Sequence, residues 1–353
     1  MFIRYDPSGL ATGRTHYVEE FIMNESAPVP SAPDTSAAPA AAFKDRSNGL
    51  IGFGVLVILI GCACAVLVPL MIVGQTMSAT RNGASPEFRP ILPAILMYAG
   101  LAVLFVSLGI GSTMARRWAR ALLLILSWAW LIVGVLTMLA MAIFLPAAFV
   151  RVPSSGGPAA MVVVMLFMLG FLSVFFLILP GILLLFYRSP HVKATCEARD
   201  PVPRWTDACP LPVLALSLLF VYGAVWMGVI LLCYRGVMPF FGYLCSGLPG
   251  GALILLLIAV WLYCAWATYH LNPTGWWTAF AAIALLLIST VLTFSRVDLM
   301  EVYRQMGYSE RQIELLQRYN YFTNQNMLVF IAISSMPFLV YLLFVKRYFR
   351  QRA

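Results

Sequence analysis

Eight long apolar runs constrain this chain more than any other feature. No Asp, Glu, Lys, Arg or His lies near the centre of any run. A helix of about twenty apolar residues matches the hydrocarbon thickness of a bilayer. The runs are continuous and do not alternate as barrel strands do, so helices are expected to satisfy the backbone there. We expect an all-α, polytopic transmembrane helical bundle with spans near 49–74, 91–113, 119–148, 160–187, 211–233, 248–268, 276–295 and 326–346.

The composition excludes a soluble globular protein. Hydrophobic residues make up 61% of the chain and charged residues only 10%, whereas soluble domains carry about 25% charged residues. The net charge of +9 is attributed to membrane topology and to attraction for anionic headgroups. No soluble segment is long enough to present a basic, aromatic-laced surface, so a nucleic-acid partner is not expected.

The runs divide the chain into two halves. Residues 1–48 are polar and contain a tract at 27–43 that is rich in Pro, Ala and Ser, and this composition predicts disorder. We expect a disordered cytoplasmic tail at 1–48, four spans in 49–187, a cytoplasmic linker loop at 188–210, four spans in 211–346 with amphipathic outer helices at 298–320, and a basic cytoplasmic tail at 347–353.

The distribution of positive charge predicts the orientation. Fifteen of the 23 lysines and arginines fall on segments that are inner if the N-terminus is inner. Arg116, Arg117, Trp118 and Arg120, between the second and third spans, are the expected topology anchors. The protein is thus predicted to be multi-pass in the cell inner (plasma) membrane, with both termini cytoplasmic and with anionic headgroups bound at that side.

Three pairs of landmarks suggest an internal repeat. They are Pro93 with Pro249, Trp118 with Trp277, and Pro180 with Pro337, at offsets of 156, 159 and 157 residues (249 − 93, 277 − 118 and 337 − 180). Because each half has an even number of spans, the halves would form two parallel four-helix repeats. Pro180 and Pro337 should kink their helices, either as hinges or as static bends.

Two loops hold cysteines whose role depends on their surroundings. Cys233 and Cys245 bracket a short outer loop and either form a disulfide or lie as thiols in the helix ends. In the linker loop, His191, Cys196 and Cys209 could offer metal ligands. Their spacing lacks the paired cysteines of structural zinc sites, so free thiols and no metal are expected.

The long outer loop before the last span predicts two short amphipathic helices. They should cover 299–306 and 310–319, with Gly307 ending the first and a Ser309–Gln312 capping box starting the second. Such helices lie along a membrane surface or cap a bundle. They could form a lid, a docking surface or a structural cap.

Glycines and tryptophans within the spans are expected to serve packing. Gly52, Gly54, Gly109 and Gly111 are predicted to be helix-packing glycines. The deeper tryptophans either pack in the core or line a ligand cavity: Trp128, Trp130, Trp226, Trp261 and Trp266.

No nucleotide, hydrolase or metalloprotease motif is present, so neither a cofactor nor an enzymatic activity is expected. The leading hypothesis is a structural or accessory membrane component without catalytic activity, with a protein partner or a homo-oligomer. The alternative is a carrier or channel for a neutral or lipid-like substrate. A cavity between the halves, lined by Trp226, Trp261, Tyr263 and Trp266, would favour it.

Overall fold

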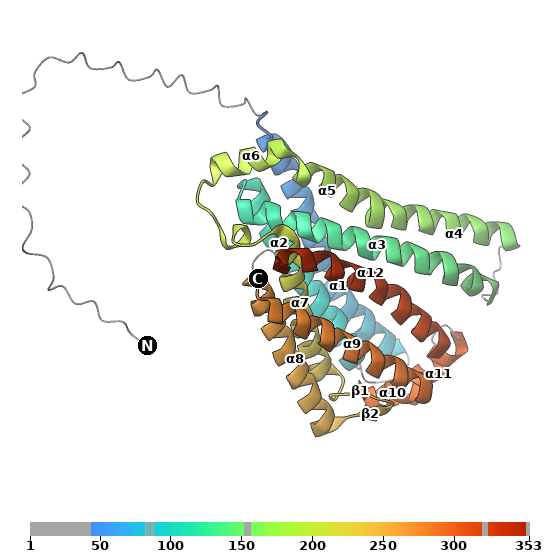
Figure 1. Cartoon of the computed structure of the whole chain (residues 1–353). Coiled ribbons are helices and arrows are strands. Elements are labelled where there is room, and N and C mark those ends of the chain that lie inside the picture. Colours follow the sequence, from blue (N-terminus) through green and yellow to red (C-terminus); the bar gives the residue numbers. More distant parts are fainter. Residues whose placement is uncertain are drawn as a thin grey trace, which may run out of the picture. The chain divides into compact units, whose positions relative to one another are not determined.

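The computed structural model describes residues 44–81, 83, 85, 88–151, 157–319 and 324–350. Within these residues, eight helices are long and apolar enough to cross a membrane. The prediction of an all-α, multi-pass membrane bundle is thereby confirmed (Figure 1). Residues 1–43 of the predicted disordered tail, and 351–353 of the basic tail, lie outside the described residues.

The spanning helices form two sets along the chain. The first set comprises α1 (Ser47–Arg81), α2 (Leu92–Thr113), α3 (Arg117–Arg151) and a fourth span built from α4 (Gly157–Ser173), the π-helical turn η2 (Val174–Ile178) and α5 (Leu179–Arg188). The second set comprises α7 (Leu211–Cys233), α8 (Gly247–Tyr269), α9 (Pro273–Arg296) and α12 (Asn324–Arg350). All eight predicted spans are therefore found.

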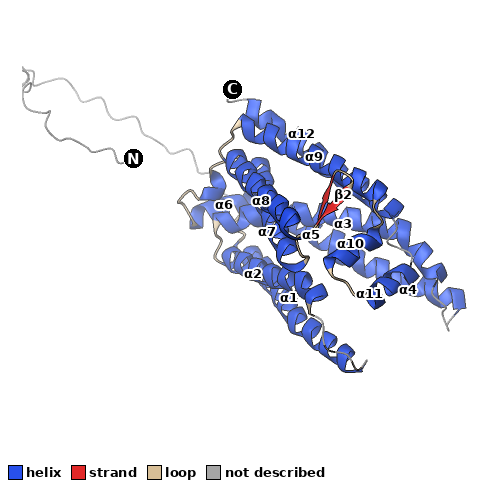
Figure 2. Cartoon of the chain, turned by 90° about the horizontal axis from the view of Figure 1, so that it is seen from below, coloured by secondary structure: helices blue, strands red, loops and turns tan. Residues whose placement is uncertain are grey.

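Short elements close both ends of the bundle. They are η1 (Arg89–Ile91), α6 (Pro190–Arg199), η3 (Trp205–Asp207), the antiparallel hairpin of β1 (Met238–Phe240) and β2 (Tyr243–Cys245), α10 (Leu299–Met306) and α11 (Glu310–Tyr319). Figure 2 shows the hairpin against the helices. We call the end that carries residues 188–210 the linker end, and the end that carries β1 and β2 the hairpin end.

The outer helices α10 and α11 have the predicted boundaries. Asp298 caps α10 by accepting a hydrogen bond from the Met300 N–H at 3.2 Å. Gly307 ends the helix with a φ of +92°, a conformation that favours glycine. The Ser309 N–H then donates to Gln312 Oε1 at 3.0 Å, as in a capping box. Local capping interactions therefore determine where α10 begins and ends and where α11 begins.

The pair α1 and α2 packs through glycines. A Cβ atom on Gly54 would lie 2.9 Å from the Gly109 carbonyl oxygen, so the backbones approach closely only because neither residue has a side chain. Gly111 likewise faces Ala119 at the start of α3. The prediction of packing glycines is confirmed for these three residues. It is wrong for Gly52, whose Cβ position has no neighbour within 4 Å.

The corners between α2 and α3 and between α8 and α9 have the same backbone geometry. Ala115 and Leu271, 156 residues apart (271 − 115), both have positive φ, +53° and +58°. In each corner the following residue, Arg116 or Asn272, donates its backbone N–H to the carbonyl oxygen five residues earlier. Both hydrogen bonds are 2.9 Å long. This is the Schellman pairing that ends a helix. The same offset pairs Trp118 with Thr274, whereas the predicted pair of Trp118 and Trp277 has an offset of 159 residues.

The buried faces of the two sets also recur. In α1 and α7 the offset is 163 residues (213 − 50), and it relates Leu50, Gly54, Val57 and Gly61 to Val213, Ser217, Phe220 and Ala224. In α2 and α8 it is 156 residues (261 − 105), and it relates Phe105, Leu108, Gly109, Gly111 and Ser112 to Trp261, Cys264, Ala265, Ala267 and Thr268. The internal repeat stays a prediction, but these matched faces extend its basis beyond three landmarks.

The two predicted kink prolines have different surroundings. Pro180 is the second residue of α5, separated from the π-helical turn η2 by one residue, whereas Pro337 lies inside the continuous helix α12. Because Pro180 has no N–H, the Phe176 carbonyl lacks its α-helical partner. A Cβ atom on Gly134 of α3 would collide with that carbonyl oxygen, so α3 and η2 are in backbone contact there. Whether either proline acts as a hinge stays a prediction.

The substitution Gly134→Ala should destabilise the protein by about 1–3 kcal/mol, because a methyl group would force α3 away from a rigid backbone carbonyl. Thermal unfolding of the detergent-solubilised protein measures the effect. The matched control is Gly170→Ala in α4, where no atom lies within 4 Å of the new Cβ. Equal melting temperatures for the two variants would contradict this account of the contact.

Candidate functional site

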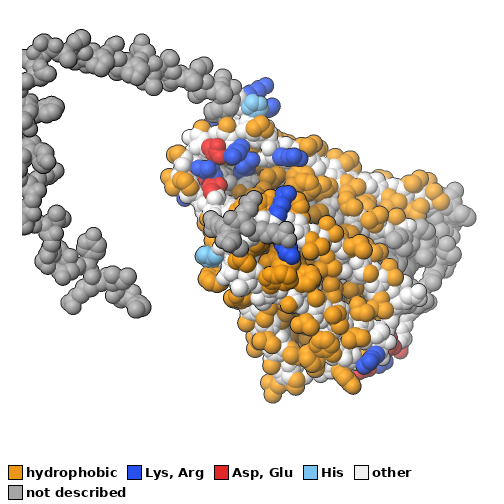
Figure 3. Space-filling view, viewed as in Figure 1, with side chains coloured by type: hydrophobic (Ala, Val, Ile, Leu, Met, Phe, Trp, Pro, Cys, Tyr) orange, Lys and Arg blue, Asp and Glu red, His pale blue; other side chains and the backbone are white. Residues whose placement is uncertain are grey.

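Charged side chains gather at the linker end of the bundle. Figure 3 shows most of the visible acidic and basic groups there, above a broad apolar surface. Residues 190–199 form α6, and residues 205–207 form η3, so the predicted linker loop is an ordered polar layer across the helix ends. Among the described residues, the remaining ion pairs lie in α10 and α11 at the other end.

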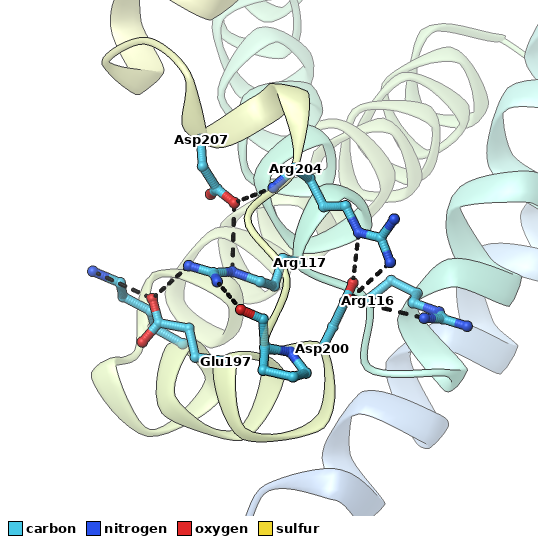
Figure 4. A network of polar contacts seen from close by, with 8 residues as sticks. Arg116, Arg117, Glu197, Asp200, Arg204 and Asp207 are labelled. Carbon is cyan, nitrogen blue, oxygen red and sulfur yellow. Dashed lines mark hydrogen bonds and ion pairs between the residues drawn. The ribbon is translucent and has the colours of Figure 1, made fainter. Parts of the chain in front are cut away.

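Asp200 is the centre of the linker-end network (Figure 4). Its side chain is only 3% exposed. Arg204 donates to both carboxylate oxygens, from Nη2 at 2.9 Å and from Nε at 3.3 Å, and Arg116 Nη1 lies 3.9 Å away. These hydrogen bonds from Arg204 are the main reason that the pKa of Asp200 lies below its usual value. The carboxylate is therefore ionised and paired.

Arg117 makes the second connection between α3 and the linker. Its guanidinium lies 3.5 Å from Glu197 and 3.4 Å from Asp207, and it also donates to the Pro201 carbonyl at 3.4 Å. The side chain is 19% exposed. Arg116 and Arg117 were predicted from the sequence as topology anchors, and that role stays a prediction; the structure shows that they hold the linker. Their acidic partners are about eighty residues away along the chain, and the sequence pattern did not identify them.

The other two predicted anchors lie further inside. Trp118 is half-buried and packs against the core of the first set. Arg120 is also half-buried, and its Nε atom has no hydrogen-bond partner among the described residues. It lines a small cavity of about 40 Å³ with Arg117 and Lys193. Because that volume holds little more than water, the cavity offers no room for a substrate.

The linker also contacts both sets of helices. The Arg46 N–H, just before α1, donates to Thr195 Oγ1 of α6 at 3.2 Å. The Tyr269 hydroxyl, at the end of α8, donates to the Trp205 carbonyl at 2.9 Å. With the arginine contacts to α3, these bonds make residues 188–210 a clasp that joins the two halves.

The thiols of the linker are not poised for chemistry. Cys196 and Cys209 are buried, and burial raises the pKa of each to about 11. A thiol with that pKa stays protonated near neutral pH and is a weak nucleophile. Within the described residues, no three His, Cys, Asp or Glu side chains are grouped so as to hold a metal ion. His191, Cys196 and Cys209 therefore do not form such a group here.

The predicted disulfide partners lie near the hairpin end. Cys233 is buried at the end of α7, and its carbonyl accepts a hydrogen bond from Arg89 Nε at 2.9 Å. Cys245 ends β2, opposite Met238. Both cysteines are free thiols in the structure. Their pairing under oxidising conditions stays a prediction.

An apolar groove of about 330 Å³ lies within the second set of helices. It is bounded by α7, α8, α9 and α12, and its walls include Phe220, Tyr222, Trp261, Leu286, Thr290 and Phe338. Trp261 stacks on Phe220 with ring centroids 5.4 Å apart and rings nearly parallel. The volume is at the lower end of the range for small-molecule sites.

The groove differs from the cavity that the sequence suggested. Of the four aromatic residues expected around a cavity between the halves, only Trp261 lines the groove. Tyr263 and Trp266 are exposed on the outer face of α8, and Trp226 is half-buried and stacks on Tyr222. The groove thus lies inside the second half of the bundle. It depends on the volumes of the side chains that face each other there, and a hydropathy pattern does not report side-chain volume.

No protein-family model, curated protein or solved structure matches this chain. The functional argument therefore rests on the linker clasp and the apolar groove.

The substitution Asp200→Asn should lower the melting temperature and expose the linker to protease, because Arg116 and Arg204 would lose their buried anionic partner. The matched control is Asp45→Asn, which removes an ion pair between exposed side chains 3.9 Å apart and keeps an amide oxygen that can accept from the Ser47 N–H. We expect Asp45→Asn to have a much smaller effect. An equal effect of the two substitutions would show that the buried network does not hold the linker.

The same network predicts the pH dependence. Because the folded-state pKa of Asp200 is lowered, its contribution to stability is fully present above its unfolded-state pKa of about 4 and is lost as the pH falls through the lower folded-state value. Acid unfolding followed from pH 7 to pH 2 should therefore be less steep in Asp200→Asn than in the wild type. Parallel curves would contradict this assignment.

Proposed function

We propose that this multi-pass membrane protein is a structural or accessory membrane component without catalytic activity. The observation that carries the proposal is the character of its two candidate sites. At the linker end the charged groups pair with one another around a 40 Å³ cavity. The 330 Å³ groove is walled by apolar side chains. Both features support binding and assembly, and neither supplies a nucleophile beside a base.

We propose further that the linker end faces the cytoplasm of the inner (plasma) membrane, with both termini on that side. The even number of candidate spans in the described residues supports a common side for the start of α1 and the end of α12. The linker end also carries a surplus of basic side chains from α3, α5 and α6. Anionic headgroups would bind at this face.

A reporter fused after Ala353 should be active only in its cytoplasmic form, because the basic linker end determines the orientation. Paired fusions measure this: a phosphatase that requires export should be inactive, and a fluorescent protein that requires the cytoplasm should fluoresce. A fusion in the loop between α7 and α8 is the control and should give the opposite pair of signals. An external C-terminus would overturn the orientation.

The accessory function predicts a partner or a second copy in the membrane. Purification in mild detergent, followed by native mass spectrometry, should give a homo-oligomer or a complex of fixed stoichiometry. The matched control is the same preparation in a harsh detergent, which should release the single chain. A lone monomer under all mild conditions would contradict an accessory role.

A carrier or channel for a neutral or lipid-like substrate is the second candidate, and the apolar groove favours it. We propose that the halves are duplicated units; the matched corners and buried faces support this, and rocking between such units is a common transport mechanism. Flux of lipid or neutral solute in vesicles that contain the purified protein would favour this function over the accessory one.

A further inference from the structure

We propose that the apolar groove of the second set binds the acyl chain of an anionic phospholipid, with the headgroup at Lys346. This goes beyond the accessory role and does not depend on it, because a lipid held here can be a permanent ligand or a cargo. The argument uses the lining of the groove, its counterpart in the first set and the charge at its linker end.

The lining selects a hydrocarbon ligand. The lining offers few polar groups: the part-buried Thr290 hydroxyl already donates to the Leu286 carbonyl at 2.7 Å, and the other polar side-chain groups are the Tyr222 hydroxyl and the Trp261 indole N–H. A polar ligand would lose its hydrogen bonds to water and gain few in return. Tyr222 and Leu219 stand at the open side and are 59% and 40% exposed. An acyl chain can therefore enter from the surrounding bilayer without crossing water.

The helix arrangement that the two sets share does not by itself produce the groove. At the corresponding position of the first set, 156 residues earlier than Leu286 (286 − 130), stands Trp130. Its ring lies 5.7 Å from that of Phe105 and 5.1 Å from that of Phe175, centroid to centroid. Aromatic rings thus fill this region in the first set, whereas the smaller Leu286 leaves space beside Trp261 in the second.

A second pair of corresponding positions, in α3 and α9, also makes the first set more tightly packed than the second. Gly134 of α3 lets the backbone of η2 approach until a Cβ atom would collide with the Phe176 carbonyl. The residue 156 positions later is Thr290 of α9, which has a branched side chain in the groove wall (290 − 134). Thr290 and Phe338 of α12 both line the groove. The second set is therefore open where the first is closed.

A positive charge stands on α12 where a headgroup would lie. Lys346 follows the groove residue Phe338 by eight residues (346 − 338), which is about 12 Å of helix toward the linker end. Its Nζ atom is 4.6 Å and 4.8 Å from the ring centroids of Trp276 and Trp277. Among the described residues it has no carboxylate within ion-pair distance.

Lys346 can bind an anion while it contacts the indoles. An ammonium group has three hydrogen-bond donors, and the ring faces use only its electrostatic attraction. Indoles at this depth are typical of the headgroup layer. The phosphodiester of a lipid whose acyl chain lies in the groove would therefore pair with the Lys346 ammonium group.

The test uses the full chain in nanodiscs that contain phosphatidylglycerol with a photoactivatable diazirine in the middle of one acyl chain. After illumination, peptide mapping locates the label. We expect the label to concentrate on the groove-lining segments of α7, α9 and α12. Label spread evenly over exposed apolar faces of both sets would overturn the proposal, because it would show ordinary boundary lipid only.

The variant Leu286→Trp should fill the groove as Trp130 fills the first set, and should reduce groove labelling several-fold. The matched control is Leu285→Trp on the same helix, whose side chain is 55% exposed and does not line the groove. It should label like the wild type. Melting curves of both variants verify folding. Undiminished labelling of folded Leu286→Trp would overturn the site.

The headgroup is tested separately with Lys346→Gln and with Arg347→Gln as its neighbour control, since Arg347 lies over the ring of Phe344. The wild type and Arg347→Gln should be labelled more by a phosphatidylglycerol probe than by a phosphatidylcholine probe with the same chain. Lys346→Gln should lose that preference and keep its fold. Equal labelling of the wild type by both probes would overturn the anionic headgroup. These readouts do not involve the oligomeric mass, so they can fail while the accessory role stands.

Discussion

Close backbone contact between small residues holds this bundle together. Lipid chains are as apolar as leucine, so helices in a bilayer gain little by hiding apolar side chains from it and depend on packing instead. Gly54 meets the backbone of α2, and Gly134 meets the backbone of η2. Gly275 approaches Ala267, with a Cβ position 2.5 Å from the Ala267 Cβ. Each contact sets how closely two helices approach. The buried faces of these helices lie along the same contacts.

The positive residues at the start of α3 hold the linker, and they are also the predicted topology anchors. In a membrane protein, arginines at a helix end orient the chain, and that role requires only their number. Arg117 also bridges Glu197 and Asp207, and Arg116 faces the buried Asp200. These pairs depend on geometry, and they fasten a polar layer that touches α1, α3 and α8. The linker is therefore part of the folded protein.

Features with a local cause could be predicted from the sequence, and features with a long-range cause could not. The spans follow from apolar length, and the boundaries of α10 and α11 follow from Gly307 and from the Ser309–Gln312 pair. The linker pairs join residues some eighty positions apart, and charge counting does not identify such partners. The groove depends on which side chains face each other across four helices. The match of Trp277 with Trp118 stays a prediction, because indoles are enriched at membrane boundaries whether or not two helices share an origin.

The unequal helix lengths of the two sets have a consequence for the surrounding bilayer. α1 and α3 have 35 residues each, whereas α7, α8 and α9 have 23, 23 and 24. At 1.5 Å per residue, the first set contains helices of about 52 Å and the second of about 35 Å, around a hydrocarbon core of about 30 Å. The last turns of α1, from Gln75 to Arg81, are polar, but residues 121–150 of α3 contain no charged residue, so α3 presents a greater hydrophobic height to its boundary lipid than α7, α8 and α9 do. The bilayer must thicken, or the longer helices must tilt, on one flank only, and this mismatch would favour particular neighbours and membranes on that flank.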